Sequence, residues 1–418
     1  MPLEQHYKRN LTWVIVLAGV SAALHIGKLA PSIPVLQQAL GISLVQAGFL
    51  LSTVQVAGMT LGLLIGLGAE TLGLRRTVLT GLAIQAVASL MGGFSHGFEA
   101  LLAFRGLEGL GFLLVVMPGP SLIRRHSTEG QIHARMGWWG TYMPTGNGLA
   151  LLLGPLLLLA FDWPVWWWLL GLVSGLAWLV MVLTVPADAL VSRAPPAGPG
   201  GSSAPGAMGP GPWTSRLRHT LASPGPWLLA LCFAVYAAQW TAIIGFLPTV
   251  YTQAGLAGAG VGVMTALVAW INVLGNVASG RLLGRGWRPQ RLLMLGYGSM
   301  TVGSLAAFLL WNGQPFPLGV QFAGVLLFSA LGGLIPGTLF ALALRLAPAR
   351  GTVSATVGFM QQWSSLGQFV GPPLVAWVAA QAGSWRLTWV VTVALSMVGL
   401  LLAQAVGRLM RQPAATPA

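Results

Sequence analysis

The feature that most constrains this chain is a succession of strongly apolar runs, each about 20 residues long and each ended by a polar or basic turn. A helix of about 20 apolar residues is long enough to cross the hydrocarbon core of a bilayer. Only 7% of the residues are charged, whereas soluble domains carry roughly a quarter, so the chain cannot cover a water-facing surface with charge. The sequence therefore predicts a polytopic membrane protein.

The apolar runs predict an all-α fold of about twelve transmembrane helices, because they lack the alternating pattern of barrel strands. We expect these helices at residues 12–37, 44–68, 77–95, 100–122, 136–160, 164–186, 226–252, 259–283, 291–311, 318–345, 352–380 and 387–407. Several connections are only a few residues long, so consecutive helices should run antiparallel.

Basic residues set the expected orientation. With a cytoplasmic N-terminus, all of the 21 Lys and Arg except Arg386, Lys28 and Arg105 fall in cytoplasmic loops or at the cytoplasmic ends of helices. This bias predicts that both termini are cytoplasmic. A group of tryptophans near the opposite interface is interpreted as lipid anchors. These are Trp163, Trp166, Trp167 and Trp168. The alternative is a substrate site in which these rings stack on the substrate.

A change of composition divides the chain into two halves. Between Pro186 and Pro226 the sequence is rich in Pro, Gly, Ser and Ala, which predicts a disordered cytoplasmic linker. The expected organisation is an N-terminal six-helix bundle at 1–186, the linker at 187–225, a C-terminal six-helix bundle at 226–411 and a tail at 412–418.

The two halves look like repeats of one another. Pro118 in the fourth span has a counterpart in Pro336 of the tenth span. At nearly the same offset, Gly154 in the fifth span is echoed by Gly371 in the eleventh. Such corresponding features are typical of transporters built from two parallel six-helix repeats.

A short motif joins the second and third spans: a glycine, an acid, a second glycine and two basic residues. Its positions are Gly66, Glu70, Gly73, Arg75 and Arg76. The pattern resembles the loop motif of the major facilitator superfamily, although the usual aspartate is Glu70 and the following basic residue is Thr71. The resemblance implies a twelve-helix transporter fold and a conformational latch in which Glu70 pairs with Arg75 or Arg76. The alternative is that these arginines only anchor the loop at lipid headgroups.

Further stretches carry the resemblance along the chain. A weaker copy of the loop motif lies at 280–288. Arg105-Gly-Leu-Glu108 resembles a second family motif, whose arginine is linked to proton or substrate handling. The stretch 148–155 is similar to a fifth-span motif of antiporters but lacks its trailing glycines, so it supports antiport only weakly.

Charged residues inside the spans limit the substrate class, because each is costly in the membrane unless it is paired or faces water. His25 and Lys28 are three residues apart in the first span and share a helix face. Arg105 and Glu108 repeat this spacing in the fourth span. The family resemblance implies that both spans line a central cavity. With a neutral His25 the charges sum to about +1, which attracts an anion.

Each of these residues has an expected role. Lys28 is the expected anion contact, with Arg105 second, because Pro31 and Pro34 should bend the helix beside Lys28 and free backbone carbonyls. Glu108 is the expected proton carrier, since a substrate anion that draws Arg105 away would let the carboxylate take up a proton.

The plainer alternatives remain open at this point. Arg105 and Glu108 could form a self-neutralising structural pair, and His25, a further candidate contact, could be a packed neutral imidazole. Lys28 could extend toward the outer surface.

The second half has no Asp or Glu, because none follows Asp188. Nothing there can neutralise a cationic substrate, so the expected substrate contacts are neutral groups that hydrogen-bond and stack. They are Tyr236, Gln239, Trp240 and Gln361, with Asn272, Asn276, Gln362 and Gln368 as further candidates. The plain alternative for each is an interhelical hydrogen bond.

Together these observations predict a secondary active transporter of the bacterial cytoplasmic membrane that moves a small anionic solute by alternating access, coupled to protons. Residues 24–34 and 246–251 are similar to the cyanate and nitroimidazole permease branch, which agrees with such a solute. The alternatives are a proton-driven exporter of drugs, siderophores or other amphiphiles, and a transporter-like sensor without flux. We expect a monomer with solute, lipid and protons as partners, and no nucleic acid, cofactor, metal or enzymatic activity.

Overall fold

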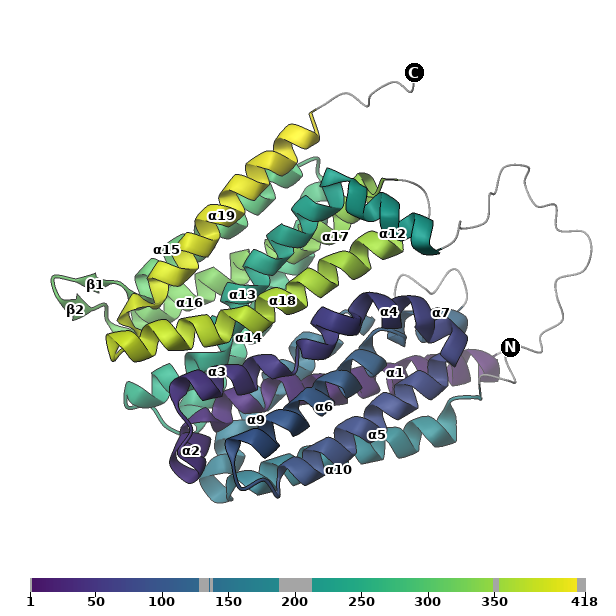
Figure 1. The fold of residues 1–418 in the computed structure, drawn as a ribbon, viewed down its shortest axis with the longest axis horizontal. Helices are drawn as coiled ribbons and strands as arrows, with labels where there is room; N and C mark the ends of the chain where they lie inside the picture. The colour runs from purple at the N-terminus through teal and green to yellow at the C-terminus, as the bar shows by residue number, and fades with distance from the viewer. Residues whose placement is uncertain (1, 128–134, 136–137, 188–212, 349–352, 412–418) are drawn as a thin grey trace, which may run out of the picture.

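The structure, a computed structural model, describes residues 2–127, 135, 138–187, 213–348 and 353–411. Figure 1 shows two helical bundles side by side, the first in purple and blue and the second in green and yellow. Most of the predicted linker and the predicted tail lie outside the described residues. The helix α12 (Trp213–Ala222) occupies the end of the segment predicted as linker.

The first bundle consists of six helical rods, and the first, second and fourth rods are each broken into two helices. Its helices are α1 (Pro2–Gly27), α2 (Leu29–Leu40), α3 (Leu44–Thr53), α4 (Val56–Leu72), α5 (Leu74–Gly92), α6 (Phe98–Val116), α7 (Gly119–Arg125), α9 (Tyr142–Ala160) and α10 (Trp163–Thr184). The first rod begins well before the predicted start, because apolarity marks where a helix enters lipid and not where it begins.

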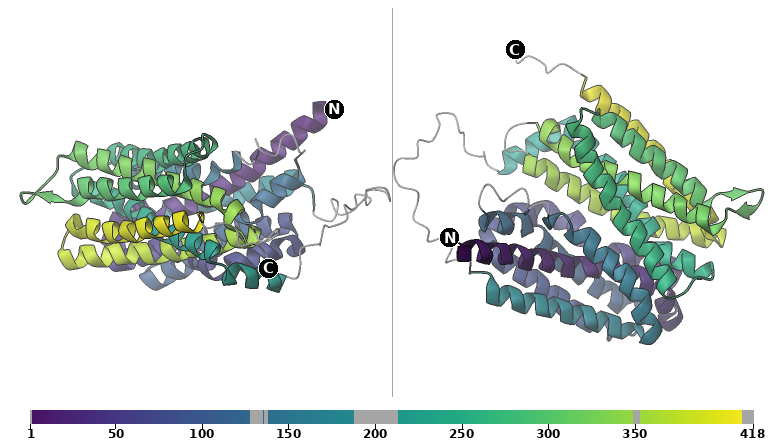
Figure 2. Two further views of the ribbon diagram at one scale, coloured as in Figure 1. Left: turned by 90° about the horizontal axis from the view of Figure 1, so that it is seen from above. Right: turned by 180° about the vertical axis from the view of Figure 1, so that it is seen from behind.

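The second bundle has the same number of rods, and its fourth rod is again broken. Its helices are α13 (Pro224–Gln253), α14 (Ala259–Gly284), α15 (Pro289–Phe308), α16 (Leu318–Gly332), α17 (Leu334–Leu346), α18 (Val353–Ala382) and α19 (Thr388–Leu409), with the 3-10 turn η2 (Trp385–Leu387) before α19. A small hairpin of β1 (Leu310–Trp311) and β2 (Gln314–Pro315) extends from one end of this bundle (Figure 2).

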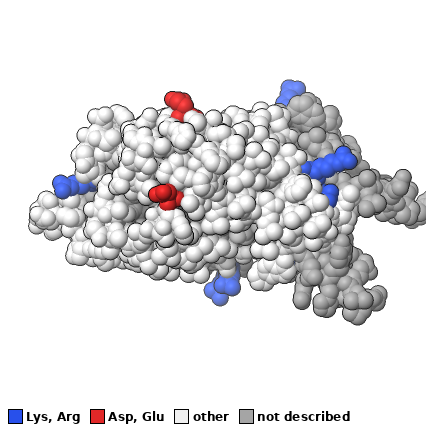
Figure 3. All heavy atoms as spheres, turned by 90° about the horizontal axis from the view of Figure 1, so that it is seen from below, with Lys and Arg blue, Asp and Glu red and all other residues white. Residues whose placement is uncertain are grey.

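Within the described ranges, nine helical stretches are long and apolar enough to cross a membrane. The helices α5, α15 and α18 complete the set of twelve rods. Figure 3 shows a face of the molecule that is almost free of charged side chains, as a surface in contact with lipid requires. The architecture is the all-α fold of two six-helix halves that the sequence predicts.

Proline and glycine mark three of the breaks in the rods. Pro31 and Pro34 lack the amide hydrogens of a regular helix, and α1 gives way to α2 at Lys28, as the sequence predicts. The fourth rod of the first bundle breaks at Pro118, and the fourth rod of the second bundle breaks at Gly333. These equivalent positions support the internal repeat.

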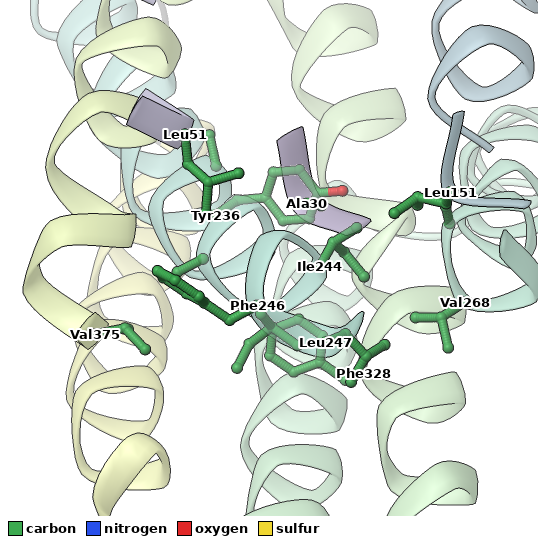
Figure 4. Close-up of a cluster of buried hydrophobic side chains, with 14 of the residues drawn as sticks. Ala30, Leu51, Leu151, Tyr236, Ile244, Phe246, Leu247, Val268, Phe328 and Val375 are labelled. Carbon is green, nitrogen blue, oxygen red and sulfur yellow. The ribbon is translucent and has the colours of Figure 1, made fainter. Parts of the chain in front are cut away.

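The two bundles meet along three sets of rods. The helix α13 packs against α2, α18 packs against α3 and α4, and α14 packs against α9. Glycines permit the closest approach: Gly48 lies against the backbone of Pro373, and Gly148 lies against the indole of Trp270. An apolar core crosses the boundary. Figure 4 shows Ala30, Leu51 and Leu151 of the first bundle with Tyr236, Ile244 and Phe246 of the second.

Basic residues gather at one end of the molecule, which we call the Arg-rich end. Its helix-terminal arginines include Arg124, Arg125, Arg281, Arg345 and Arg408. The apolar core around Ile15, Leu122 and Trp139 near this end contains described residues of the first bundle alone. First-bundle members of the shared core come from the middle and the opposite end. The bundles accordingly diverge toward the Arg-rich end, at the right of Figure 1.

Close helix packing inside the second bundle makes a testable prediction about glycine. A Cβ atom at Gly275 of α14 would lie 2.0 Å from the carbonyl oxygen of Ala330 on α16, so Gly275→Ala should lower the free energy of unfolding by about 1–3 kcal/mol. Gly280 on the same helix has open space around it, so Gly280→Ala should be neutral or slightly stabilising. Thermal unfolding in detergent measures both, and equal midpoints would contradict the packing argument.

Candidate functional site

Four side chains that the sequence singles out come together inside the first bundle. His25 and Lys28 come from the first rod and Arg105 and Glu108 from α6, and each is at most 1% exposed. Ionised groups at such depth are held only by partners that replace water. The contacts of each group therefore define what the site can do.

Glu108 lies at the centre of this charge cluster. Its Oε1 accepts a hydrogen bond from Lys28 Nζ, and its Oε2 accepts one from Arg105 Nη1 at 2.6 Å. The Nδ1 atom of His25 lies 3.4 Å from Oε1. The pairing of Arg105 with Glu108 that their spacing predicts is present, and Lys28 joins the same carboxylate instead of extending to the surface.

The Lys28 ammonium is enclosed by polar and aromatic partners. It donates to Ser89 Oγ at 2.9 Å and lies 4.6 Å from the centre of the Trp167 ring, a cation–π contact. Trp166 donates to the carbonyl of Lys28 at 3.2 Å, which occupies a carbonyl at the break of the rod. The interpretation of these tryptophans as lipid anchors is wrong for Trp163, Trp166 and Trp167, because they are buried in the bundle.

Two further connections tie the cluster to neighbouring helices. His25 Nε2 lies 2.7 Å from Ser174 Oγ on α10, which in turn lies 3.0 Å from Ser21 Oγ. Arg105 Nη1 donates to the carbonyl of His25 at 2.7 Å, and Arg105 Nε donates to the carbonyl of Leu50 on α3 at 3.3 Å. Arg105 therefore contacts the first and second rods as well as Glu108.

The charges of the cluster do not balance. Lys28 and Arg105 carry two positive charges against the single negative charge of Glu108, with His25 neutral. Arg105 Nη2 is buried and has no hydrogen-bond partner among the residues that the structure describes. An ion taken from water loses several kcal/mol of solvation, so a second cation at this depth is costly to bury.

The cluster is enclosed by α5 and α10 on one side and by the first rod and α6 on the other. In this conformation the hydrogen bonds of the cluster described above go to residues of the first bundle. A solute in a cavity between the bundles would therefore reach Lys28 only after a local rearrangement, for which the broken first rod provides a joint.

The second bundle contains a neutral polar network at the level of its broken rod. Asn272 Nδ2 donates to Tyr236 Oη at 3.0 Å and to the carbonyl of Ser329 at 2.8 Å. Trp240 Nε1 donates to Ser329 Oγ at 3.1 Å, and Asn276 Nδ2 donates to Asn272 Oδ1 at 3.0 Å. Two of the predicted substrate contacts, Tyr236 and Trp240, thus share one network across α13, α14 and α16.

Two other predicted contacts lie apart from this network. Gln239 is fully buried and accepts a hydrogen bond from Ser396 of α19 at 3.0 Å, which is the plain interhelical role. Gln361 of α18 has a buried Oε1 without a hydrogen-bond partner in the described part of the chain. Gln361 Oε1 can therefore still accept a hydrogen bond.

The loop motif lies at the Arg-rich end, between α4 and α5. Its positions are Gly66, Glu70, Gly73, Arg75 and Arg76. Gly73 has a φ of 90°, a conformation that favours glycine, and this explains a glycine at the turn between the helices. Arg75 donates to the carbonyl of Val182 on α10 at 2.9 Å, and Arg76 is exposed. The Glu70 side chain lies outside what the structure describes.

Sequence reasoning missed the partners that α5 and α10 contribute to the cluster. Ser89 and Ser174 are short polar residues in apolar helices, and neither forms a charged pattern of its own. One signal was available: Gln85 and Ser89 are four residues apart in α5 and share a face. That face meets the cluster, because Gln85 Nε2 donates to the carbonyl of Glu108 at 3.4 Å.

A bundle of twelve rods in two related halves, with ion-paired side chains enclosed between its helices, defines a multi-pass membrane transporter. Residues 14–366 match the Major Facilitator Superfamily, and the chain belongs to this superfamily. Its members are transporters and not enzymes, so the predictions of the family, of the fold and of no enzymatic activity are confirmed.

Several known proteins are similar to this chain. Monocarboxylate transporter 11 of Mus musculus is 29% identical over 343 residues, which cover 76% of this chain and 69% of that protein. The tetracenomycin C resistance and export protein of Streptomyces glaucescens is 30% identical over 167 residues, covering 39% of this chain and 30% of that protein. Among solved structures, a bacterial homolog of the human lysosomal transporter Spinster, inward-facing and occupied, has a TM-score of 0.75 at 16% identity, covering 98% of this chain and 99% of its own.

The shared carboxylate makes a prediction about stability. Glu108→Gln leaves Lys28 and Arg105 without a counter-charge and should cost about 3–5 kcal/mol, whereas Lys28→Met/Glu108→Gln removes one of the two cations and should cost less than Glu108→Gln alone. Thermal unfolding, followed by tryptophan fluorescence, measures the stability of the parent, of Glu108→Gln, of Lys28→Met and of the double variant. Glu99→Gln, at an exposed acid in the first turn of the same helix, is the matched control and should be near neutral. Additive losses in the double variant would contradict the pairing.

Proposed function

We propose that this chain moves a small anionic solute across the bacterial cytoplasmic membrane by alternating access, coupled to protons. The observation that carries the proposal is the surplus positive charge of the buried Lys28, Arg105 and Glu108 cluster. A cation would be repelled by this charge, and the second half offers no carboxylate to bind one.

Lys28 is the proposed anion contact and Arg105 the second. Both cations now share the Glu108 carboxylate, so a substrate carboxylate or similar anion can take its place on one of them. Glu108 then loses a stabilising partner and takes up a proton, which gives one proton per anion. His25, 3.4 Å from Glu108, lies close enough to respond to the same change.

The neutral network of the second bundle is the proposed opposite wall of the substrate site. Tyr236 and Trp240 supply a hydroxyl, an indole N–H and aromatic surface, and Gln361 supplies an unpartnered acceptor. Such groups suit the polar and apolar parts of a small organic anion. The similarity to a monocarboxylate transporter supports this solute class.

The conformation supports an inward-facing state. The proposed orientation, with both termini cytoplasmic, makes the Arg-rich end the cytoplasmic end. The bundles are packed together at the opposite end and diverge at this one (Figure 1). The latch formed by Glu70 with Arg75 or Arg76 remains a proposal for the state in which the cytoplasmic ends close.

Export of an amphiphilic compound is the second candidate. The similarity to the tetracenomycin C resistance and export protein favours it, over 39% of this chain. The two candidates differ in the preferred solute: small anions for the first, and bulky apolar compounds for the second.

Ligand-induced stabilisation tests the anion site. Small carboxylates should raise the unfolding temperature of the purified parent protein but not of Lys28→Ala, because the ammonium that binds them is gone. The matched control is Lys8→Ala, the only other lysine of the chain, which should keep the response. Stabilisation only by cations or bulky amphiphiles, unchanged in Lys28→Ala, would overturn the anion site and favour export.

Proton coupling is tested by the pH dependence of uptake into proteoliposomes. A pH gradient with the acid side outside the vesicles should drive the parent protein to take up the anion that stabilises it. Glu108→Gln should abolish the response to the gradient because the amide cannot be protonated. Glu99→Gln is again the control and should behave like the parent. An undiminished response in Glu108→Gln would exclude Glu108 as the proton carrier.

A further inference from the structure

We propose that Arg105 and Gln55 act as positioning residues, which couple the charge cluster to the contact between the two bundles. The inference rests on the proposed proton coupling and concerns the break in the second rod, between α3 and α4. This break contains no proline, so its cause lies in its contacts.

The cluster holds the break open through a backbone carbonyl. In a continuous helix the amide of Val54 would bond to the carbonyl of Leu50. Here the carbonyl of Leu50 accepts a hydrogen bond from Arg105 Nε at 3.3 Å, and the chain closes a tighter turn in which the Gln55 amide bonds to the carbonyl of Ser52 at 2.8 Å. Arg105 therefore occupies the acceptor that would close the helix.

The same break fits against α6 at a second point. The carbonyl of Val54 packs against Gly109, and a Cβ atom at Gly109 would lie 2.1 Å from that oxygen. Gly109 directly follows Glu108 in the chain. The break thus contacts α6 at two points, Arg105 and Gly109.

Beyond the break, the second rod forms polar contacts with the second bundle. Gln55 is buried and donates from Nε2 to Gln368 Oε1 on α18 at 3.0 Å. Gln362 of α18 donates to the carbonyl of Met59 at 2.8 Å. We call these two hydrogen bonds the glutamine clasp. The clasp joins the two bundles directly after the break.

The groups that face Glu108 come from every helix packed around it. His25, Lys28 and Arg105 contact the carboxylate, while Gln85 bonds the backbone carbonyl of Glu108, Ser89 bonds Lys28 and Ser174 bonds His25. None of these described neighbours is a second carboxylate. In the proposed coupling Glu108 or His25 takes up the proton, and either one changes the charge that Arg105 faces.

A change of charge at the cluster can then alter the hydrogen bonds of the glutamine clasp. When Glu108 no longer holds the guanidinium, Arg105 releases the carbonyl of Leu50, and the Val54 amide can complete the helix. The rod straightens at the break and turns Gln55 away from its partner. The protonation state of the cluster in one bundle thereby sets how firmly that bundle holds the other.

Distance measurements between the bundles test this coupling. Spin labels at Leu183→Cys and Leu344→Cys, exposed positions near the Arg-rich end of each bundle, report bundle separation in lipid nanodiscs, while the native Cys232 is buried. The parent should change its distance distribution between neutral and acidic pH. Gln55→Leu should reduce the shift in populations about 2- to 10-fold, the size expected for one lost hydrogen bond. The infrared band of protonated Glu108 should persist in Gln55→Leu, which separates lost coupling from lost protonation.

A matched control and a second variant keep the test decisive. Gln321→Leu, which removes a side-chain hydrogen bond to the carbonyl of Phe316 in its own bundle, should respond like the parent. If Gln55→Leu does not fold, Gln368→Leu breaks the same bond from the other side and should give the same loss. A full pH response in either clasp variant overturns this inference alone, whereas a parent that does not respond to acid overturns it together with proton coupling.

Discussion

One carboxylate, Glu108, pairs with buried cations from two different helices, and much of the first bundle is arranged around it. Lys28 reaches it from the break of the first rod, and Arg105 reaches it from one turn away on α6. Because each ion would be costly alone in the membrane, the helices that carry them must stay together. The serines of α5 and α10 and the ring of Trp167 complete the enclosure.

The sequence was informative wherever the controlling interaction is local. Apolar length placed the rods, Pro31 and Pro34 located the bend at Lys28, and the three-residue spacing of Arg105 and Glu108 predicted their pairing. Contacts between distant residues were not accessible in this way. Lys28 and Glu108 are 80 positions apart, and only the packing of the first rod on α6 brings them together. The break in the second rod was missed for a related reason: no proline marks it, and the Leu50 carbonyl beside it is contacted by Arg105 from another helix.

The contact between the bundles combines two kinds of interaction with different consequences. Apolar side chains and glycines provide close packing that does not depend on charge, as Gly148 against Trp270 illustrates. The glutamine clasp adds hydrogen bonds whose geometry depends on where the second rod breaks. An apolar core crosses this boundary, so separation of the bundles would uncover part of that core.

The lack of carboxylates in the second half has a consequence for how such a protein can diversify. Its membrane-spanning helices carry no Asp, Glu or His, so their chemistry stays constant across the physiological pH range. Every group that titrates in that range within the membrane belongs to the other half. If the proposed substrate contacts are correct, mutations in α13, α14 and α16 alter which solute is preferred without changing the titrating groups of the first half, and selectivity and driving force become separately adjustable properties.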